Sequence, residues 1–318
     1  MPVTGIDKKV LTQVCIIVRD VEASTARYAE ILGIDMSPNF QTTLLHDHTH
    51  ATYYGQPTDA HARLSSLNIG HLQFELLQPL EPPSSWGDFL DQHGEGIHHV
   101  AFFVPTAEAV AKSFADYGYQ VTQWGLFTGQ SGSYTYLDTD KDLAVVIELL
   151  EHFGGSPELN GPPFPADKGL GTDIVCQVGI VVKDIDQAVK RYGEVLGLTP
   201  SWRETTLGHA VTKATYRGQP SEATAKLAFF STGQVQIELI EPDEKPSAWR
   251  DFLDQNGAAA HHIAFQVADT QRAIDYLAQF GITVIQQGLY SDGSGVYTYM
   301  DSQQQLGTTI ELLQSFKR

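Results

Sequence analysis

The sequence predicts an α+β protein of two tandem domains, each built from two βαβββ modules. Its 318 residues exceed the size, about 250–300 residues, at which one hydrophobic core usually divides. The second half of the chain repeats the first, and each half alternates short strand patterns with helical ones. The period is long and only two copies occur, so a duplicated domain is favoured over a solenoid.

An internal repeat runs through almost the whole chain. The segment QVCIIVRD at 13–20 matches QVGIVVKD at 177–184, an offset of 164 residues, and later matches keep an offset of 163. They pair GQP at 55–57 with 218–220, Trp86 with Trp249, HH at 98–99 with 261–262, and IELL at 147–150 with 310–313. Glycine and proline are frequent between the copies, which is typical of a linker. We therefore predict a first domain at 1–152, a linker at 153–172 and a second domain at 173–318.

Each half contains the elements of two modules in order. A β-branched run at 14–18 predicts the first strand, Asp20 is suited to cap the helix that follows, and Gly33 is suited to end it. Further strands of this module are predicted at 40–46, 51–54, 63–69 and 71–78. The second module is predicted as a strand at 98–104, a helix at 106–117 closed by Gly118, and strands near 121–124, 133–138 and 144–150.

The charge and composition exclude several classes of partner. The chain has 20 Lys and Arg against 38 Asp and Glu, a formal net charge of −18, and contains no basic cluster. Nucleic acid and anionic membranes are therefore not expected as partners. The two cysteines give no disulfide framework, the N-terminal residues lack the apolar segment of a signal peptide, and no apolar run is long enough to cross a bilayer. These features predict a cytoplasmic protein.

Polar side chains interrupt the apolar faces of several predicted strands. Strand alternation puts Glu75, Glu148 and His99 each on one face of its strand, with hydrophobic neighbours. A lone buried carboxylate is costly, whereas two carboxylates and an imidazole that converge with Gln13 are stabilised by one divalent cation. The second half repeats this set as Gln177, Glu238, His262 and Glu311. The neighbouring residues His98 and His261 face the other way, and we expect them to be structural.

Three repeated motifs resemble those of the vicinal oxygen chelate superfamily, which includes glyoxalase I, methylmalonyl-CoA epimerase, extradiol dioxygenases and bleomycin-binding proteins. They are FELLQP at 74–79, GIHHVAF at 96–102 and VIELL at 146–150. The resemblance implies that the modules of each half pair into an open, cup-shaped mixed sheet. It places the ligands of a divalent metal at Gln13, Glu75, His99 and Glu148, and at Gln177, Glu238, His262 and Glu311.

The resemblance also implies an activity. The expected metal is Zn, Ni, Co or Mn, with up to two ions per chain, and the expected substrate is a small molecule with vicinal oxygens. Glu148 and Glu311 would move a proton alpha to a carbonyl, with an enediolate or enolate as the product of that step. The protein would then be an epimerase, an isomerase or a glyoxalase-like lyase.

Two other functions stay open at this point. Extradiol dioxygenases of the superfamily hold Fe(II) with two His and one Glu, and the first of these His falls where this chain has Gln13 and Gln177. A binding or resistance protein would hold its ligand without turnover, but such proteins usually lack the metal ligands, and both sets are complete here. The chain could act as a monomer or as a homodimer.

The two halves differ in charge. Residues 1–160 hold 7 Lys and Arg against 20 Asp and Glu, whereas residues 161–318 hold 13 against 18. Arg203, Lys213 and Arg217 align with Phe40, His50 and Tyr54, and strand alternation puts residues 213 and 217 on one face. We expect the second site to prefer anions, the alternative being that these cations are solvated.

The remaining candidates are histidines. His46 aligns with His209, whereas His48 and His50 have no counterpart. The alternation of His46, His48 and His50 suggests a strand that either bears a second metal site or places surface and pocket-lining imidazoles. We expect the latter, with His46 and His209 near the substrate.

Overall fold

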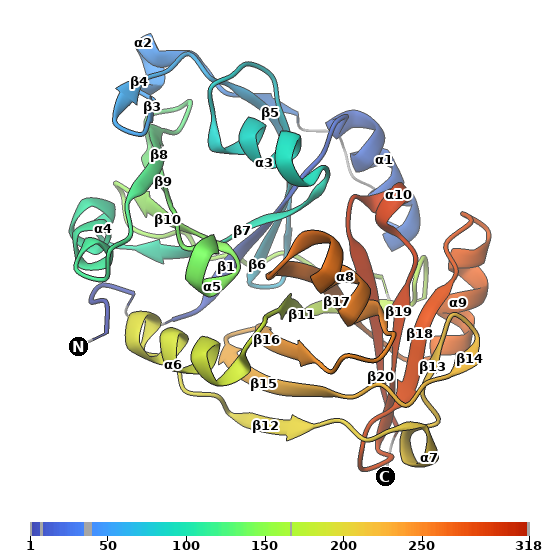
Figure 1. Ribbon diagram of the computed structural model, residues 1–318. Helices are drawn as coiled ribbons and strands as arrows, with labels where there is room; N and C mark the ends of the chain where they lie inside the picture. The colour runs from blue at the N-terminus through green and yellow to red at the C-terminus, as the bar shows by residue number, and fades with distance from the viewer. Residues whose placement is uncertain (1, 7–8, 35–39, 166, 317–318) are drawn as a thin grey trace.

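The protein consists of two similar halves, each organised around one curled ten-stranded mixed sheet (Figure 1). The computed structural model describes residues 2–6, 9–34, 40–165 and 167–316. The predicted α+β class and tandem arrangement are confirmed.

The bounds of the elements show the repeat. The first half contains β1 (Leu11–Ile17), α1 (Val21–Leu32), β2 (Gln41–Thr42), α2 (His46–Thr49), β3 (Thr52–Tyr53), β4 (Gln56–Pro57), β5 (Ala62–Ile69), β6 (Leu72–Pro79), α3 (Ser85–His93), β7 (Gly96–Val104), α4 (Ala107–Ala115), β8 (Val121–Leu126), β9 (Gly132–Leu137), α5 (Asp140–Leu143) and β10 (Val146–His152). The second half contains β11 (Thr172–Val181), α6 (Ile185–Leu196), β12 (Trp202–Thr205), α7 (His209–Thr212), β13 (Thr215–Tyr216), β14 (Gln219–Pro220), β15 (Ala225–Thr232), β16 (Val235–Pro242), α8 (Ala248–Asn256), β17 (Ala259–Val267), α9 (Thr270–Ala278), β18 (Val284–Leu289), β19 (Gly295–Met300), α10 (Gln303–Leu306) and β20 (Thr309–Ser315).

The sheet of the first half has the strand order β2-β5-β6-β1-β7-β10-β9-β8-β3-β4, and the second sheet repeats it. The opening strands of the two modules, β1 and β7, pair antiparallel at the centre. β1 pairs parallel with β6, and β7 pairs parallel with β10. The last strand of each module therefore flanks the central pair, and the four strands bring their concave-face side chains together.

The first helix shows how local signals set the elements. Asp20 accepts a hydrogen bond from the Ala23 N–H and so satisfies a free donor at the start of α1. Gly33 ends the helix with a φ of 67°, a left-handed conformation that glycine adopts without strain. Asp184 and Gly197 play the same parts for α6.

Hydrophobic residues form three clusters. The largest combines residues of both halves, and it contains the buried faces of α1 and α6 together with Val14 and Val178 of the central strands. Two smaller clusters line the concave faces, around Trp86 in the first half and Trp249 in the second. One shared core thus supports two separate cups.

One predicted strand is wrong. The segment 40–46 forms only the two-residue strand β2, and the histidines that follow lie on the short helix α2. Asp59 accepts a hydrogen bond from the His46 N–H, and His50 ends the helix in a left-handed conformation with a φ of 51°. The hairpin of β3 and β4 then leaves its own module and pairs with β8. These long-range contacts override the local alternation of residue types.

The halves dock through a pair of equivalent contacts. The Tyr28 hydroxyl donates to the Leu306 carbonyl over 2.8 Å, and the Tyr192 hydroxyl donates to the Leu143 carbonyl over the same distance. Both tyrosines are fully buried. α1 therefore packs on α10 while α6 packs on α5, as in a symmetric dimer whose two copies are joined in one chain.

We expect removal of either docking hydroxyl to destabilise the whole chain. Tyr28→Phe and Tyr192→Phe each leave a buried carbonyl without its donor, which costs about 1–3 kcal/mol. Urea denaturation would show a lower midpoint for each variant with a single transition. A control is Tyr54→Phe, because the Tyr54 side chain is 57% exposed. Unchanged midpoints for both buried variants would contradict the role of these contacts.

The connection between the halves has no helix or strand from 153 to 171 among its described residues, yet it is tied to the first half. Gly161 forms a β-bridge with Gly70, and the Leu170 N–H donates to the Ile31 carbonyl over 3.0 Å. Leu159 and Phe164 are buried. Throughout the described chain, no helix is long and apolar enough to cross a membrane.

Candidate metal centres

In the first half, four buried side chains converge on the concave face of the sheet. They come from β1, β6, β7 and β10 and are Gln13, Glu75, His99 and Glu148. The His99 Nε2 atom lies 3.1 Å from Glu148 Oε2, 3.2 Å from Gln13 Oε1 and 3.9 Å from Glu75 Oε2. The structure thus brings together all four residues that the sequence singled out here.

The second half repeats this arrangement. The His262 Nε2 atom lies 3.1 Å from Glu311 Oε2 and 3.5 Å from Glu238 Oε2. These three residues offer ligand atoms within 4.8 Å of one another. Gln177 lines a cavity in this half together with Glu238 and Glu311. In the first half, the three residues whose ligand atoms lie within 4.8 Å of one another are Glu75, His99 and, unexpectedly, Cys15.

The donor atoms of these clusters suit a divalent cation. Eleven buried side-chain atoms of the described residues have no hydrogen-bond partner, and four of them belong to these clusters: Glu148 Oε2, Glu238 Oε2, His262 Nε2 and Glu311 Oε2. Such atoms are rare in folded proteins because each lost hydrogen bond is costly. Carboxylate oxygens and imidazole nitrogens are common ligands of divalent transition metals, and one such ion would satisfy these atoms together.

Burial without a cation disfavours the charged form of one carboxyl group in each cup. Burial raises the pKa of Glu75 to about 7, opposed by nearby His99 and reinforced by Glu148. Burial also raises the pKa of Glu238 well above its ordinary value, and the neighbouring carboxylates Glu311 and Glu204 add to this effect. Each cup therefore favours either protons or a bound cation at these positions.

A second glutamine orients the first in each cup. The Gln13 Nε2 amide donates to Gln73 Oε1 over 2.6 Å, and the Gln177 Nε2 amide donates to Gln236 Oε1 over 3.1 Å. With the amide nitrogen engaged, the carbonyl oxygen is left for the centre. Sequence reasoning missed Gln73 and Gln236, although both follow the 163-residue offset and share a strand with a predicted ligand.

A neighbouring imidazole supports each central histidine. The Nδ1 atoms of His98 and His99 lie 2.9 Å apart, and those of His261 and His262 lie 3.2 Å apart. Burial lowers the pKa of His98 and of His261 well below the ordinary value, so both rings are neutral. The structural role predicted for these two residues is thus more specific than packing, because each contacts the ring that faces the carboxylates.

The two centres differ at one strand position. Cys15 lies on the concave face beside Glu75, and burial raises the pKa of its thiol well above the ordinary value. The aligned residue is Gly179, and a Cβ atom built there would overlap the His262 ring. The sequence showed Cys15 only as part of an apolar strand, but its separation of two residues from Gln13 could have placed it in the cup.

We expect Gly179→Ala to disrupt the second centre selectively. The added Cβ must displace the His262 ring, at a cost of about 1–3 kcal/mol in overpacking. The content of Mn²⁺ per chain should fall by about one ion, as measured by mass spectrometry of the metal. Gly193→Ala is the control, because a Cβ atom built at this position of α6 lies 3.4 Å from the Leu198 carbonyl oxygen, an ordinary contact. A full metal content in Gly179→Ala would contradict the assignment of His262.

The cup of the second half encloses a cavity of about 610 Å³. Such a volume holds a small molecule. Gln177, Glu238 and Glu311 lie in its wall, together with six aromatic residues and five other polar side chains. The aromatic residues are Trp202, Phe229, Trp249, Tyr290, Tyr297 and Tyr299, and the polar ones include Glu204, Ser291 and Asp292.

A family model matches both halves of the chain. The model describes the Glyoxalase/Bleomycin resistance protein/Dioxygenase superfamily and matches residues 12–136 and 176–299. The chain belongs to this superfamily. Both matches lie within the predicted domains and include the first three predicted ligands of each half, so the resemblance seen in the sequence is confirmed.

Individual members of the superfamily are more distant. The chain is 32% identical over 122 residues to a 2-epi-5-epi-valiolone epimerase of Actinomyces sp, a match that covers 36% of this chain and 63% of that protein. It is 29% identical over 112 residues to an ethylmalonyl-CoA/methylmalonyl-CoA epimerase of Cereibacter sphaeroides, over 35% of this chain and 73% of that protein. An uncharacterized protein, YqjC of Bacillus subtilis, is 36% identical over 88 residues, or 28% of this chain and 53% of that one.

Solved structures of this superfamily fold match the whole chain. A mutant of 4-hydroxymandelate synthase from Streptomyces coelicolor superposes with a TM-score of 0.58 at 14% identity, over 98% of this chain and 94% of that one. The 2,3-dioxygenase LapB of Pseudomonas sp. KL28 gives a TM-score of 0.50 at 16% identity, over 99% and 94%. At these identities the likeness shows the shared two-domain fold.

The structure does not place the predicted Lys and Arg side chains at the cavity of the second half, whose described lining contains no Lys or Arg. Arg203 pairs with Asp186, and Arg217 pairs with Asp251 at 2.8 Å. The prediction that residues 213 and 217 share a strand face is wrong, because Lys213 ends helix α7 and Arg217 lies between β13 and β14. The preference for anions loses its basis, since Glu204 and Asp292 face this cavity instead.

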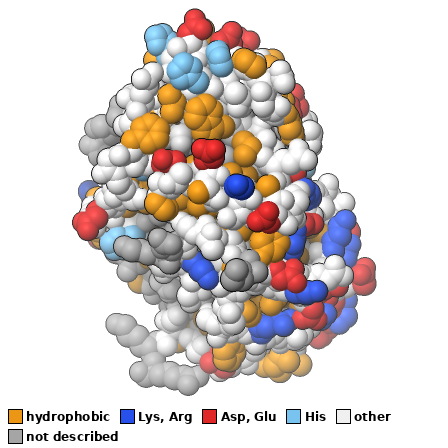
Figure 2. All heavy atoms as spheres, turned by 90° about the vertical axis from the view of Figure 1, so that its left-hand side faces the viewer, with side chains coloured by type: hydrophobic (Ala, Val, Ile, Leu, Met, Phe, Trp, Pro, Cys, Tyr) orange, Lys and Arg blue, Asp and Glu red, His pale blue; other side chains and the backbone are white. Residues whose placement is uncertain are grey.

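The predicted histidines serve local structure. His46 Nδ1 lies 2.8 Å from the Ala51 carbonyl, and His209 Nδ1 lies 2.7 Å from the Ala214 carbonyl, so each ring braces its own short helix. Neither residue lines the cavity of the second half, so the structure does not place His209 near a substrate there as expected. Histidine side chains gather at the end of the first half that carries α2 (Figure 2), and no metal-binding group is found there among the described residues. These histidines are therefore surface imidazoles, as expected, and do not form a second metal site among the described residues.

Proposed function

We propose that each half binds one divalent cation, held by Gln13, Glu75, His99 and Glu148 in the first half and by the repeated set in the second. The observation that carries this proposal is the convergence, in each half, of an imidazole with two buried carboxyl groups. One carboxyl oxygen of Glu148 and one on each carboxyl of the second half lack a hydrogen-bond partner among the described residues. The second set comprises Gln177, Glu238, His262 and Glu311.

We further propose that the second cup catalyses proton transfer alpha to a carbonyl, as in an epimerase, an isomerase or a glyoxalase-like lyase. When bound, the cation would supply Lewis-acid stabilisation of the oxygen that gains charge as the proton leaves. Glu311, which lines the cavity, would take that proton on its carboxylate. Two of the relatives are named as epimerases, which supports this reaction type.

The remaining residues of the cup would orient the substrate and exclude water. Trp249 and Tyr299 are buried and pack with their rings 5.8 Å apart at 84°. Glu204 lies in the cavity wall with Ser291, and burial raises the pKa of the Glu204 carboxyl. Such a lining favours an uncharged molecule that carries hydroxyl groups over an anionic one.

Deuterium exchange tests the reaction type with substrates of several classes. The chain would be loaded with Mn²⁺ and incubated in D₂O with methylmalonyl-CoA, dihydroxyacetone, and the hemithioacetal of methylglyoxal and glutathione. At least one compound should incorporate deuterium alpha to its carbonyl. Glu311→Gln should slow this exchange by about 10²–10⁴-fold, the usual contribution of a general base.

Four outcomes would count against the proposal. One is exchange at the wild-type rate by a chain that carries both Glu148→Gln and Glu311→Gln. A second is exchange that survives removal of the metal by EDTA, and a third is the absence of exchange with all three compounds. The last is a protein purified with iron that consumes oxygen, which would indicate a dioxygenase.

A further inference from the structure

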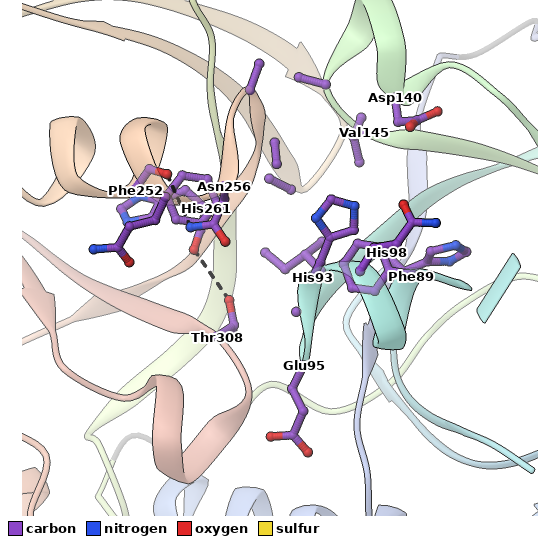
Figure 3. Close-up of a pocket in the computed structure, with 18 of the residues that line it drawn as sticks. Phe89, His93, Glu95, His98, Asp140, Val145, Phe252, Asn256, His261 and Thr308 are labelled. Atoms are coloured by element: carbon purple, nitrogen blue, oxygen red, sulfur yellow. Dashed lines mark hydrogen bonds between the residues drawn. The ribbon is translucent and has the colours of Figure 1, made fainter. Parts of the chain in front are cut away.

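Another cavity, separate from both cups, lies between the two halves. It has a volume of about 500 Å³ and is walled by α3 and the start of β7 from the first half and by α8 and the start of β17 from the second (Figure 3). None of the residues proposed as metal ligands lines it. Its size is within the range of cavities that bind small molecules.

The two walls of this inter-half cavity mirror each other. Phe89 and His98 line one side, and their counterparts Phe252 and His261 line the other. The ring centroids of Phe89 and His98 lie 5.2 Å apart, and those of Phe252 and His261 lie 4.7 Å apart. The cavity therefore offers an aromatic ring and an imidazole from each half.

Each imidazole presents a polar ring nitrogen to this space. His98 is 2% exposed and His261 is 4% exposed, and the Nδ1 atom of each is engaged by the next histidine in the chain. Without a cation, the Nε2 atom of His99 donates to the carboxylates that it faces, its Nδ1 accepts from His98, and the Nε2 atom of His98 is an acceptor. A cation on the Nε2 atom of His99 would move the hydrogen of that ring to Nδ1 and make the Nε2 atom of His98 a donor. The same argument holds for His261.

The lining of the cavity is strongly acidic. It contains six carboxylates, which are Asp88, Glu95, Asp138, Asp140, Asp251 and Asp301. Arg217 is the one Lys or Arg among the described lining residues, and it pairs with Asp251 at 2.8 Å. Asp140 and Asp301 form no ion pair with any described residue. The excess of negative charge in a confined space favours a cationic ligand.

We propose that the inter-half cavity binds a small heteroaromatic cation that carries a carboxamide group. The rings of Phe89 and Phe252 offer π faces to such a cation, and the carboxylates of Glu95 and Asp140 balance its charge. The carboxamide of the ligand would donate a hydrogen bond to the imidazole of His98 or of His261 in the metal-free chain, and would accept one from it in the metal-loaded chain.

The same imidazoles join this cavity to both metal centres. When a cation is bound in the cup, a ligand group that accepts the Nε2 hydrogen of His98 makes the Nδ1 atom of His98 a stronger acceptor. The hydrogen bond that His99 donates to this Nδ1 atom is then stronger. A ligand in the cavity would therefore change the affinity of the centres for their cations, and the cations would change the affinity for the ligand by the same factor. This coupling rests on the proposed function, whereas binding to the cavity does not.

Three related pyridines that differ in charge test the binding. They are 1-methylnicotinamide, a cation, nicotinamide, which is neutral, and nicotinate, an anion. Calorimetric titration of the metal-free chain should show saturable binding of 1-methylnicotinamide, weaker binding of nicotinamide and no binding of nicotinate. A chain with Glu95→Gln and Asp140→Asn should bind the cation at least fivefold more weakly, whereas Asp47→Asn, an exposed carboxylate outside the cavity, should leave the affinity unchanged.

Each result decides the proposal. Nicotinate that binds as tightly as the cation, an unchanged affinity in the double variant, or no saturable binding would overturn the cavity assignment. Repeating the titration with the Mn²⁺-loaded chain tests the coupling, since equal affinities with and without Mn²⁺ would overturn that part alone. A chain that binds 1-methylnicotinamide but no Mn²⁺ would support the cavity and contradict the proposed metal centres.

Discussion

Replacement of His262 by Ala should reduce the Mn²⁺ content of the chain from about two ions to about one. His262 is fully buried, and its Nε2 atom faces two carboxylates at 3.1 and 3.5 Å. The loss of a neighbour that hydrogen-bonds to a metal ligand already lowers metal affinity by about 10–100-fold, so the loss of the ligand itself should lower it more. Mass spectrometry of the metal after dialysis measures the content, and His99→Ala should give the same result from the other half.

Combined variants and a matched control make this result specific. A chain that carries both His99→Ala and His262→Ala should hold no Mn²⁺ after dialysis. His209→Ala removes an imidazole from the second half that braces α7, and it should keep about two ions. If His262→Ala retained both ions, or if His209→Ala lost one, the assignment of the second centre would be wrong.

The metal-free chain should lose stability as the pH rises from about 4.5 to about 7. Burial raises the pKa of Glu75 to about 7 in the folded protein, above the value of 4.5 for an exposed carboxyl. The stability that the protonated carboxyl provides is therefore fully present below the unfolded pKa and is lost as the pH passes through the folded one. Glu75→Gln cannot ionise, so at pH 8 this variant should exceed the metal-free wild type in unfolding free energy by roughly 3 kcal/mol.

Thermal unfolding at several pH values measures this effect. The difference between Glu75→Gln and wild type should be small at pH 4.5 and should reverse when Mn²⁺ is added at pH 8, because only the wild type offers a full ligand set. Glu81→Gln, which alters an exposed carboxyl, should follow the wild type at every pH. A Glu75→Gln chain that is less stable than wild type at pH 8 without metal would show that the carboxylate is stabilised by other means.

The sequence was sufficient to predict the four proposed ligands of each cup, although not Gln73, Gln236 or Cys15. Glu75, His99 and Glu148 were visible because each is an ionisable residue in an apolar strand, and strand periodicity applies directly to the folded sheet. The repeat then gave the second set, since the aligned positions hold the same residue types. The caps of the first helix, Asp20 and Gly33, were equally local signals and were confirmed.

Features that depend on long-range contacts were not predictable in this way. The histidines at 46, 48 and 50 alternate as in a strand, but the contact with Asp59 and the left-handed His50 place them on a short helix and its end. Cys15 resembled an ordinary core residue, because a buried cysteine in an apolar strand is common. Its place beside Glu75 became clear only from the pairing of β1 with β6.

The charges of the second half show a related limit. Alignment with the first half placed Arg203, Lys213 and Arg217 at positions of interest, but each of them has a nearby partner of its own. Glu204 aligns with Gln41 of the first half and lines the cavity of the second half. This difference, and not the three cations, indicated the charge of the cavity. The inter-half cavity could not be predicted from the sequence, because it depends on how the halves dock, with α3 on one wall and α8 on the other.

The most direct test of the central claim is the anomalous X-ray scattering of crystals of the full chain grown with Mn²⁺. Two peaks per chain are predicted, one beside His99 Nε2 and Glu148 Oε2 and the other beside His262 Nε2 and Glu311 Oε2, at about 2.0–2.2 Å from the ligand atoms, the usual range for imidazole and carboxylate ligands of a divalent metal. Peaks only at the histidines around α2, or no peak in either cup, would contradict the assignment of both metal centres.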